Sequence, residues 1–199
     1  MMDRETLKVY AASAGAYADR FGKKRDPEQV ADAAAFLALV PKGGRLLDLG
    51  CGPGQWAATF ADAGYTVEAT DASPEMAALA LERFGLTVRV EPFEALDAQA
   101  RYDGIWANFS LLHAPRADFP GHLARIHRAL KPGGALHLAL KLGTGEKRDH
   151  LGRFYSYFTV KELTRHLGDA GFTIVQSREA ESAGLAGSTD PFIALTARA

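Results

Sequence analysis

The sequence lacks several features that would assign it to a secreted or membrane class. Its only cysteine, Cys51, has no partner for an intrachain disulfide. No apolar run approaches the roughly 18 to 20 residues that span a bilayer. The first residues include Asp3, Arg4 and Glu5, where a secretion signal would have an apolar stretch. We therefore expect a cytoplasmic protein with no membrane partner.

An excess of charge of one sign is also missing, because 23 Lys and Arg stand against 24 Asp and Glu. A chain without a general positive field has no long-range attraction for nucleic acid. The short basic run 23–25 is interpreted as a solvated turn, so we expect no nucleic-acid partner. The length of 199 residues, with 47% hydrophobic residues, is typical of one globular domain.

Two nucleotide-binding signatures are absent as well. The phosphate loop G-x-x-x-x-G-K-[ST] does not occur, and the dinucleotide fingerprint G-x-G-x-x-G does not match. The glycines that are present, Gly50, Gly52 and Gly54, follow the pattern G-x-G-x-G. This spacing disfavours NAD.

Strands and helices alternate through most of the chain, which predicts a parallel sheet with right-handed crossovers. A helical segment, residues 3–21, and a helix over 27–40 come first. We expect seven strands, at 45–49, 66–70, 86–91, 102–107, 134–140, 172–178 and 192–197. Helices are expected at 53–63, 74–83, 117–130 and from Thr159 to near Gly171. Residues 143–153 are expected to form a polar loop, and the segment 182–190 is expected to join the last two strands as an antiparallel hairpin.

The most informative segment is Asp48 to Gly54, where the first strand of the alternating region passes into a helix. Glycine there lets the backbone approach a ligand, and the helix N-terminus presents unpaired N–H donors. Asp71 ends the second strand about 20 residues later, where an acid accepts hydrogen bonds from ribose hydroxyls. Alternatively, Asp71 caps the helix that begins near Pro74, although Ser73 is the better cap. The pattern predicts a site for a nucleoside cofactor.

Residues 46–54 resemble motif I of the class I S-adenosylmethionine-dependent methyltransferases. The resemblance covers roughly 45–199: residues 102–108 are similar to the family's fourth strand, and 130–134 to the turn before its fifth. It implies an α/β, Rossmann-like, doubly wound seven-stranded sheet in the order 3-2-1-4-5-7-6, with strand 7 antiparallel and helices on both faces. We expect a single methyltransferase domain over 1–199, in which a helical lid, 1–40, covers the core, 45–199.

The resemblance also implies how S-adenosyl-L-methionine is bound. The backbone of the glycine loop would approach the methionine part and the ribose, Asp48 would fix the loop or orient the amino group, and Asp71 would hold the ribose. Pro92 stands where the family often has an acid for the adenine, so Phe93 and Glu94 are expected to serve there. Asn108 and Phe109 would border the sulfonium. The full expected set is Asp48, Gly50, Cys51, Gly52, Gly54, Asp71, Ala72, Phe93, Glu94, Asn108 and Phe109.

Candidates for chemistry and for acceptor binding come from other segments. His113 follows the fourth strand and is the leading candidate for a general base, with packing as the alternative interpretation. The acceptor pocket is expected to use Tyr10, Tyr17, His113, Arg153, Tyr155 and Tyr157, and the alternative is that this aromatic cluster only packs. His122, His127 and His137 are interpreted as surface residues. No pair of histidines has the spacing of metal ligands, so no metal is expected.

The sequence therefore predicts a methyltransferase that moves a methyl group from S-adenosylmethionine to a small-molecule acceptor by in-line displacement. The small acceptor is favoured because 107–110 lacks the Asn/Asp-Pro-Pro-Tyr motif of amino-methylating nucleic-acid enzymes. A catalytically silent S-adenosylmethionine-binding module is the main alternative, and an NAD-dependent oxidoreductase is a weaker one. The acceptor, the methylated atom and the oligomeric state stay open.

Overall fold

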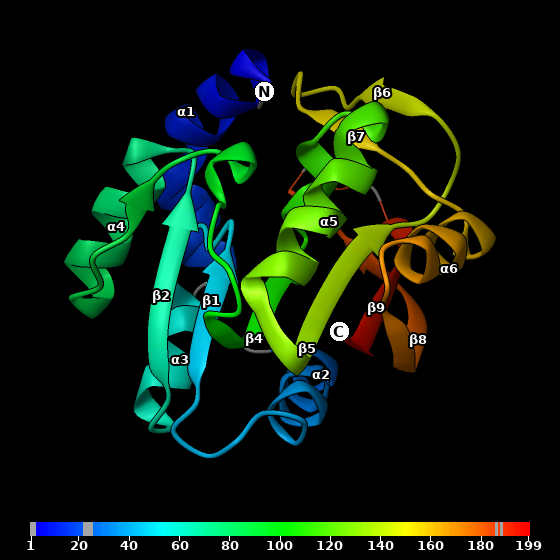
Figure 1. Cartoon of the computed structure of the whole chain (residues 1–199). Helices are drawn as coiled ribbons and strands as arrows, with labels where there is room; N and C mark the ends of the chain where they lie inside the picture. The colour runs from blue at the N-terminus through cyan, green and yellow to red at the C-terminus, as the bar shows by residue number, and fades with distance from the viewer. Residues whose placement is uncertain (1–2, 22–25, 186, 188) are drawn as a thin grey trace.

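The computed structural model describes residues 3–21, 26–185, 187 and 189–199. Its centre is a seven-stranded sheet in the order β3-β2-β1-β4-β5-β9-β8 (Figure 1). β9 runs antiparallel to both of its neighbours, whereas the other strands are parallel to one another. The predicted doubly wound Rossmann-like order, with its last strand antiparallel, is thereby confirmed. The strands are β1 (Arg45–Leu49), β2 (Thr66–Asp71), β3 (Arg89–Val90), β4 (Tyr102–Asn108), β5 (Leu130–Lys141), β8 (Thr173–Ala183) and β9 (Thr189–Arg198).

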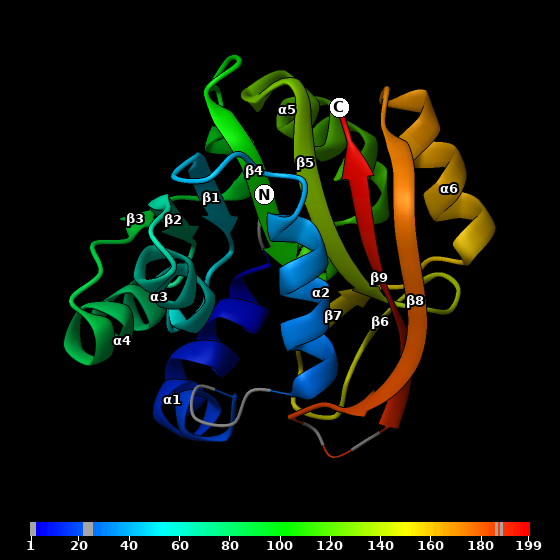
Figure 2. The same cartoon turned by 90° about the horizontal axis from the view of Figure 1, so that it is seen from below.

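Helices cover both faces of this sheet. In Figure 2, α2 lies in front of the central strands and α5 behind them. α1 lies across the carboxyl ends of the strands, next to α4 (Figure 1). The α-helices are α1 (Arg4–Phe21), α2 (Pro27–Leu37), α3 (Gln55–Asp62), α4 (Pro74–Phe84), α5 (Phe119–Ala129) and α6 (Val160–Asp169). Three short 3-10 helices are η1 (Phe93–Ala95), η2 (Leu111–His113) and η3 (Arg116–Asp118).

Alternating side chains of the central strands divide the core into two layers. Leu47 and Ile105 belong to the larger cluster, which packs against α5 and α6, whereas Leu46 and Trp106 belong to the cluster under α2 and α3. Successive residues of a strand point to opposite faces, so strands covered on both sides carry nearly continuous apolar runs. Burial on both faces leaves the carboxyl ends of β1, β2 and β4 as the accessible edge, and this edge positions the site.

Two helix starts follow the capping chemistry expected from the sequence. The Ser73 hydroxyl accepts a hydrogen bond from the Met76 N–H at 3.2 Å and begins α4. At the start of α6, Thr159 and Glu162 form a capping box in which each side chain bonds to the backbone of the other. These caps set where the two helices begin after β2 and β7.

The structure differs from the sequence-based expectation between residues 143 and 156. A short antiparallel hairpin, β6 (Glu146–Arg148) and β7 (Phe154–Ser156), stands where a polar loop was predicted. Its strands are too short to show a periodic pattern, and β6 is exposed on every residue. β5, β8 and β9 are also longer than expected, whereas β3 is only two residues long. The predicted turn at 23–25 lies outside the described residues.

No described helix combines the length and the apolar character that crossing a bilayer requires.

Candidate functional site

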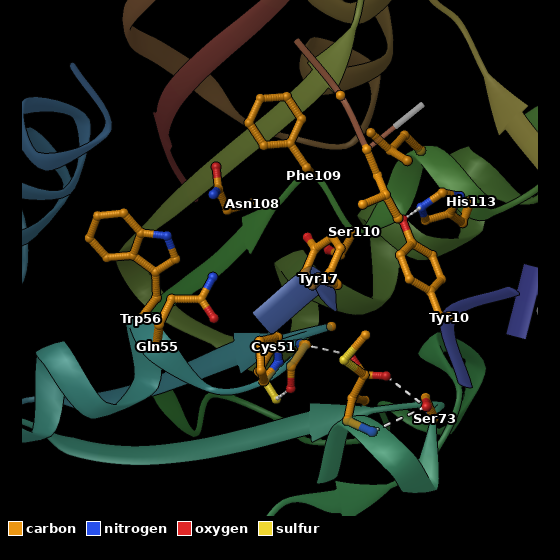
Figure 3. Close-up of a pocket in the computed structure, with 18 of the residues that line it drawn as sticks. Tyr10, Tyr17, Cys51, Gln55, Trp56, Ser73, Asn108, Phe109, Ser110 and His113 are labelled. Carbon is orange, nitrogen blue, oxygen red and sulfur yellow. Dashed lines mark hydrogen bonds between the residues drawn. The ribbon is translucent and has the colours of Figure 1, made fainter. Parts of the chain in front are cut away.

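A cavity of about 440 Å³ opens at the carboxyl ends of β1, β2 and β4, under α1 (Figure 3). Its size lies within the usual range for small-molecule sites, and its position matches the crevice where open α/β sheets bind ligands. One end is lined by the glycine loop, Asp71, Met76 and Phe93. The other end is lined by α1, β7, the end of β5 and residues 181–185. The cavity therefore joins segments that are far apart in the sequence.

The glycine loop forms one wall with its backbone. Gly50, Gly52 and Gly54 all have positive φ, and the N–H groups of Gly50 and Cys51 both donate to the carbonyl of Thr70 at 2.8 and 2.9 Å. A Cβ at position 50 would lie 2.4 Å from the Cβ of Ser110, which is far inside contact distance. Glycine is required at position 50 because the loop passes directly against the turn that follows β4.

That turn is itself unusual, because Phe109 has a φ of +55°. Positive φ is uncommon outside glycine and is typical of sites where the surrounding structure holds the backbone in place. The Phe109 N–H donates to the carbonyl of Ala139 at 3.1 Å, and the ring packs edge-on against Phe192. These contacts hold the backbone turn that brings Ser110 to the glycine loop.

Asp71 connects the loop to the start of α4. One carboxylate oxygen accepts from the Gly52 N–H at 2.8 Å, and the other accepts from the Ser73 N–H at 2.9 Å. Burial raises the pKa of Asp71, and the backbone N–H groups of Ser73, Gly52 and Ala72 act in the opposite direction. A carboxylate has about four lone-pair positions, so Asp71 keeps acceptor capacity for a hydroxyl donor from a ligand.

Four buried polar atoms of the cavity lining have no hydrogen-bond partner among the described residues. They are Asp48 Oδ2, Gln55 Oε1, Trp106 Nε1 and Ser110 Oγ. Leaving a buried donor or acceptor unpaired costs about 1 to 3 kcal/mol, so such atoms are rare and call for an explanation. Such unpaired atoms beside the cavity fit a site that takes a polar ligand.

Asp48 is the most deeply buried carboxyl of the lining, at 3% exposure. Burial raises its pKa to about 8, opposed by the Ala57 N–H and reinforced by the charge of Asp71. At neutral pH the carboxyl is therefore largely protonated in the ligand-free protein. A positive charge brought beside it would favour the ionised form.

His113 is buried and takes part in a network that ties α1 to β7. Its Nδ1 lies 2.7 Å from the Phe154 carbonyl, which can only accept, so Nδ1 carries the proton. The Tyr10 hydroxyl lies 2.8 Å from Nε2 and donates to it (Figure 3). Burial lowers the pKa of His113 to about 4, so the ring is neutral, and its one basic lone pair is occupied by Tyr10.

Arg153 completes this network at 2% exposure. Its guanidinium donates to Asp149 through Nε and Nη2 at 2.9 and 2.7 Å, and through Nη1 to the Tyr10 hydroxyl at 3.2 Å. It also lies 5.2 Å from the centre of the Tyr155 ring. The charge of Arg153 is thus compensated within the protein before any ligand binds.

Replacing Tyr10 with phenylalanine should lower the free energy of unfolding by about 1 to 3 kcal/mol, because it leaves His113 Nε2 and an Arg153 N–H buried without a partner. Urea unfolding of the two proteins would measure the difference. Tyr65→Phe is the matched control, since no hydrogen bond of the Tyr65 hydroxyl is found in the described structure and the ring is only partly buried. Equal losses in the two variants would contradict the network.

A second network positions Asn108 at the opposite wall. The Nε2 of His137 lies 3.2 Å from Asn108 Oδ1, and Asn108 Nδ2 donates to Gln29 Oε1 at 3.4 Å. His137 stacks on Trp106 with ring centres 3.6 Å apart. Burial lowers the pKa of His137 to about 3, so the neutral ring donates its proton and fixes which way the amide faces. The expectation that His122 and His137 are surface residues was wrong, because α2 covers this face of β5 and His122 is buried at 3% exposure.

Most of the residues predicted for the site line this one cavity: Tyr10, Tyr17, Asp48, Gly50, Cys51, Gly52, Asp71, Ala72, Phe93, Asn108, Phe109, His113, Arg153 and Tyr155. Three predicted residues do not. Gly54 packs toward Ala80. Glu94 does not line the cavity, although its neighbour Phe93 does. Tyr157 lies under the Lys147 ammonium, 4.6 Å from its ring centre.

Other lining residues had no signal in the sequence. They are chiefly Gln29 from α2, Gln55 and Trp56 from α3, Lys141 at the end of β5, and residues 181–185 from the end of β8 and the start of the turn after it. Lys141 alone could have been found, since it ends a strand whose carboxyl end faces the crevice. Its ammonium bonds to Asp190 at 2.6 Å and lies 4.2 Å from the centre of the Tyr155 ring.

Comparison with known families gives a match over most of the chain. Residues 21–177 match the family described as "Methyltransferase domain". The malonyl-[acyl-carrier protein] O-methyltransferase of Pseudescherichia vulneris is 35% identical over 114 residues, which are 54% of this chain and 45% of that protein. The ubiquinone biosynthesis O-methyltransferase of Xanthomonas oryzae pv. oryzae is 32% identical over 145 residues, which are 67% of this chain and 59% of that protein. The chain spans about half the length of the curated relatives it matches.

Solved structures include one similar over nearly the whole chain. The 1,6-didemethyltoxoflavin-N1-methyltransferase of Burkholderia thailandensis, solved with 1,6-didemethyltoxoflavin and S-adenosylhomocysteine, has a TM-score of 0.77 and 29% identity. The similarity covers 98% of this chain and 87% of that one. A methyltransferase structure from Methanosarcina mazei, at 22% identity and a TM-score of 0.72 over 82% and 96% of the two chains, shows the same fold.

Proposed function

Because the chain belongs to the class I S-adenosylmethionine-dependent methyltransferases, we propose that it methylates a small-molecule acceptor held in the same cavity as the cofactor. The observation that carries this proposal is the extent of the cavity, which continues from the glycine loop and Asp71 to Lys141, Tyr155 and residues 181–185. One end suits a nucleoside, and the other leaves room beside it for a second small molecule. α1 lies over both.

The cofactor end fits S-adenosylmethionine in its donor and acceptor pattern. The unused lone pairs of the Asp71 carboxylate would accept the ribose hydroxyls, and Phe93 would form a wall for the adenine. Gly50 and Gly52 would let the backbone approach the methionine part, and the unpaired Asp48 Oδ2 is suited to an ammonium group. Cys51, Ala72 and Asn108 would complete the contacts.

S-adenosylmethionine supplies an electrophilic methyl group on a sulfonium, so the chain mainly has to bind and align. Holding an acceptor atom in line with that methyl is worth several kcal/mol and up to about 7 to 11 in well-oriented systems. We assign this alignment to Asn108, fixed by His137, and to Phe109, held by its strained backbone. Closure by α1 would exclude water from the same space.

The acceptor end favours a small molecule with a planar ring. Tyr10, Tyr155 and Phe109 contribute aromatic side chains to its lining. The two cations there, Lys141 and Arg153, already have carboxylate partners, so they do not demand a strongly anionic acceptor. The Burkholderia thailandensis relative, whose named substrate is 1,6-didemethyltoxoflavin, supports this choice.

For His113 the geometry supports positioning of α1 rather than direct proton transfer. Its basic nitrogen receives the Tyr10 proton, so an acceptor proton would reach it only through the Tyr10 hydroxyl. With an identified acceptor, His113→Asn would separate the two roles. A positioning role predicts a raised KM and an unchanged pH profile of kcat, whereas a base role predicts loss of the acidic limb of that profile.

The proposed function is tested in two steps on extensively dialysed protein. Calorimetric titration with S-adenosylmethionine, S-adenosylhomocysteine and NADH should give binding of the two adenosyl compounds only. Methyl-labelled S-adenosylmethionine is then incubated with a panel of hydroxy- and aza-aromatic compounds, and with tRNA and a protein mixture as controls. Label in a small compound supports the proposal. Label only in the macromolecules contradicts it, and binding without transfer to any partner supports the silent-module alternative.

Cofactor affinity should rise with pH up to about pH 8, because Asp48 loses a proton when the cofactor binds. The rise should be at most tenfold per pH unit. The raised pKa means that the ligand-free protein holds a proton on Asp48. The ammonium group of the ligand favours the ionised Asp48 carboxylate, so binding releases that proton and is promoted as the pH rises. Calorimetry with S-adenosylhomocysteine from pH 6 to pH 9 measures the slope. Asp48→Asn should lose this component, and an identical slope in both proteins would contradict it.

A further inference from the structure

Outside the cavity, three potential metal ligands from three elements converge. They are Glu94 in η1, Asp118 at the end of η3 and His122 in the first turns of α5. Each offers one ligand atom, and these atoms all lie within 4.8 Å of one another. None of the three residues lines the cavity described above. The cluster is therefore separate from the cofactor and acceptor contacts.

His122 shows that the cluster is more than a surface group of acids. Its side chain is 3% exposed, and neither ring nitrogen has a hydrogen-bond partner in the part of the chain that the structure describes. A buried imidazole normally bonds through at least one nitrogen, so this ring lacks a partner of the kind that a metal ion provides.

We propose that Glu94, Asp118 and His122 bind a divalent first-row transition metal ion of the Zn²⁺ type. Two carboxylates offset the charge of such an ion, and one imidazole with carboxylate oxygens is a donor set that suits it. Three protein ligands leave a fourth tetrahedral position for water. Bonds of about 2.0 to 2.2 Å would bring the ligand atoms to within roughly 3.5 Å of one another, which requires only small side-chain rotations from the observed cluster.

The position of the cluster indicates what the ion would do. Phe93, the residue before Glu94, lines the cavity, and its ring meets the His122 ring edge-on with centres 5.7 Å apart. An ion bound here would link η1 to the start of α5 and hold Phe93 in the cavity wall. It would thus act as a structural cross-link beside the cofactor end, without touching the reacting atoms.

The experiment uses Co²⁺ as a spectroscopic probe and Zn²⁺ as a competitor, on metal-free protein without an affinity tag. The wild type should bind one Co²⁺ with visible absorption that Zn²⁺ abolishes. Asp118→Asn and His122→Gln should each weaken Co²⁺ binding at least tenfold, and Zn²⁺ should raise the melting temperature of the wild type but not of either variant. His150→Ala is the control, because it removes an exposed imidazole remote from the cluster in sequence and should leave binding unchanged.

Asp118→Asn preserves the size of the side chain, so it keeps the test valid if the buried His122→Gln variant does not fold. Equal Co²⁺ affinity in the wild type and Asp118→Asn would overturn the proposal. So would the absence of a Co²⁺ absorption band in the wild type, or loss of binding in His150→Ala alone.

Discussion

Replacing Asp71 with alanine should weaken S-adenosylmethionine binding by about 10- to 150-fold, or about 1.5 to 3 kcal/mol, the usual worth of hydrogen bonds to a charged group. The carboxylate would lose its bonds to the ribose hydroxyls. It would also lose the two hydrogen bonds that connect it to the Gly52 and Ser73 N–H groups, so the loop would no longer be held for the cofactor.

Calorimetric titration with S-adenosylhomocysteine measures this effect without an acceptor. Asp71→Asn keeps one acceptor oxygen and should show a smaller loss than Asp71→Ala. Asp62→Ala removes an exposed carboxylate outside the cavity lining and should bind as the wild type does. Unchanged affinity in a folded Asp71→Ala protein would refute the assigned role.

Gly50→Ala should lower the free energy of unfolding by about 2 to 5 kcal/mol and abolish measurable cofactor binding. The positive φ of +74° costs a residue with a Cβ about 1 to 2 kcal/mol. The new Cβ would also lie 2.4 Å from the Ser110 Cβ and 3.2 Å from the Phe93 ring, and relieving such overpacking typically costs about 1 to 3 kcal/mol. The loop or the turn after β4 must move, and both line the cavity.

Gly64→Ala separates the cost of a positive φ from the cost of the steric overlap. Gly64 has a φ of +89°, but a Cβ there would meet nothing within 4 Å. This variant should therefore show only the backbone cost and should retain cofactor affinity. Urea unfolding and calorimetry of both variants give the comparison, and similar losses in the two proteins would mean that the close approach at Gly50 has no effect of its own.

Local chemistry explains why much of the fold was predictable. Apolar runs of the right length, glycines after β1 and caps such as Ser73 and Thr159 act over a few residues, and each is visible in the sequence. The β6–β7 hairpin was missed because its strands are too short and too polar to carry a period. The ends of β8 and β9 were missed because the pairing of the two strands, rather than their composition, extends them.

The candidate site likewise has residues that the sequence predicts and residues that only the fold brings to the cavity. The glycine loop and Asp71 follow consecutive strands, so one motif located both. Gln29 and Lys141 reach the cavity from other layers of the fold. The same limit applies to Glu94, Asp118 and His122, of which only the last two, one helical turn apart, were close enough in the sequence to suggest a pair.

The sequence by itself determined the alternation of strands and helices and the residues around the glycine loop, because these depend on short-range pattern and turn geometry. The order of the strands and the class of cofactor followed from the resemblance to a known family. Only the tertiary structure decided the states of the buried polar groups. In the folded chain the Tyr10 hydroxyl donates to His113, Asp48 is buried, and Glu94 lies near His122. Burial and hydrogen-bond partners are properties of the packed chain, because they depend on contacts between residues many positions apart.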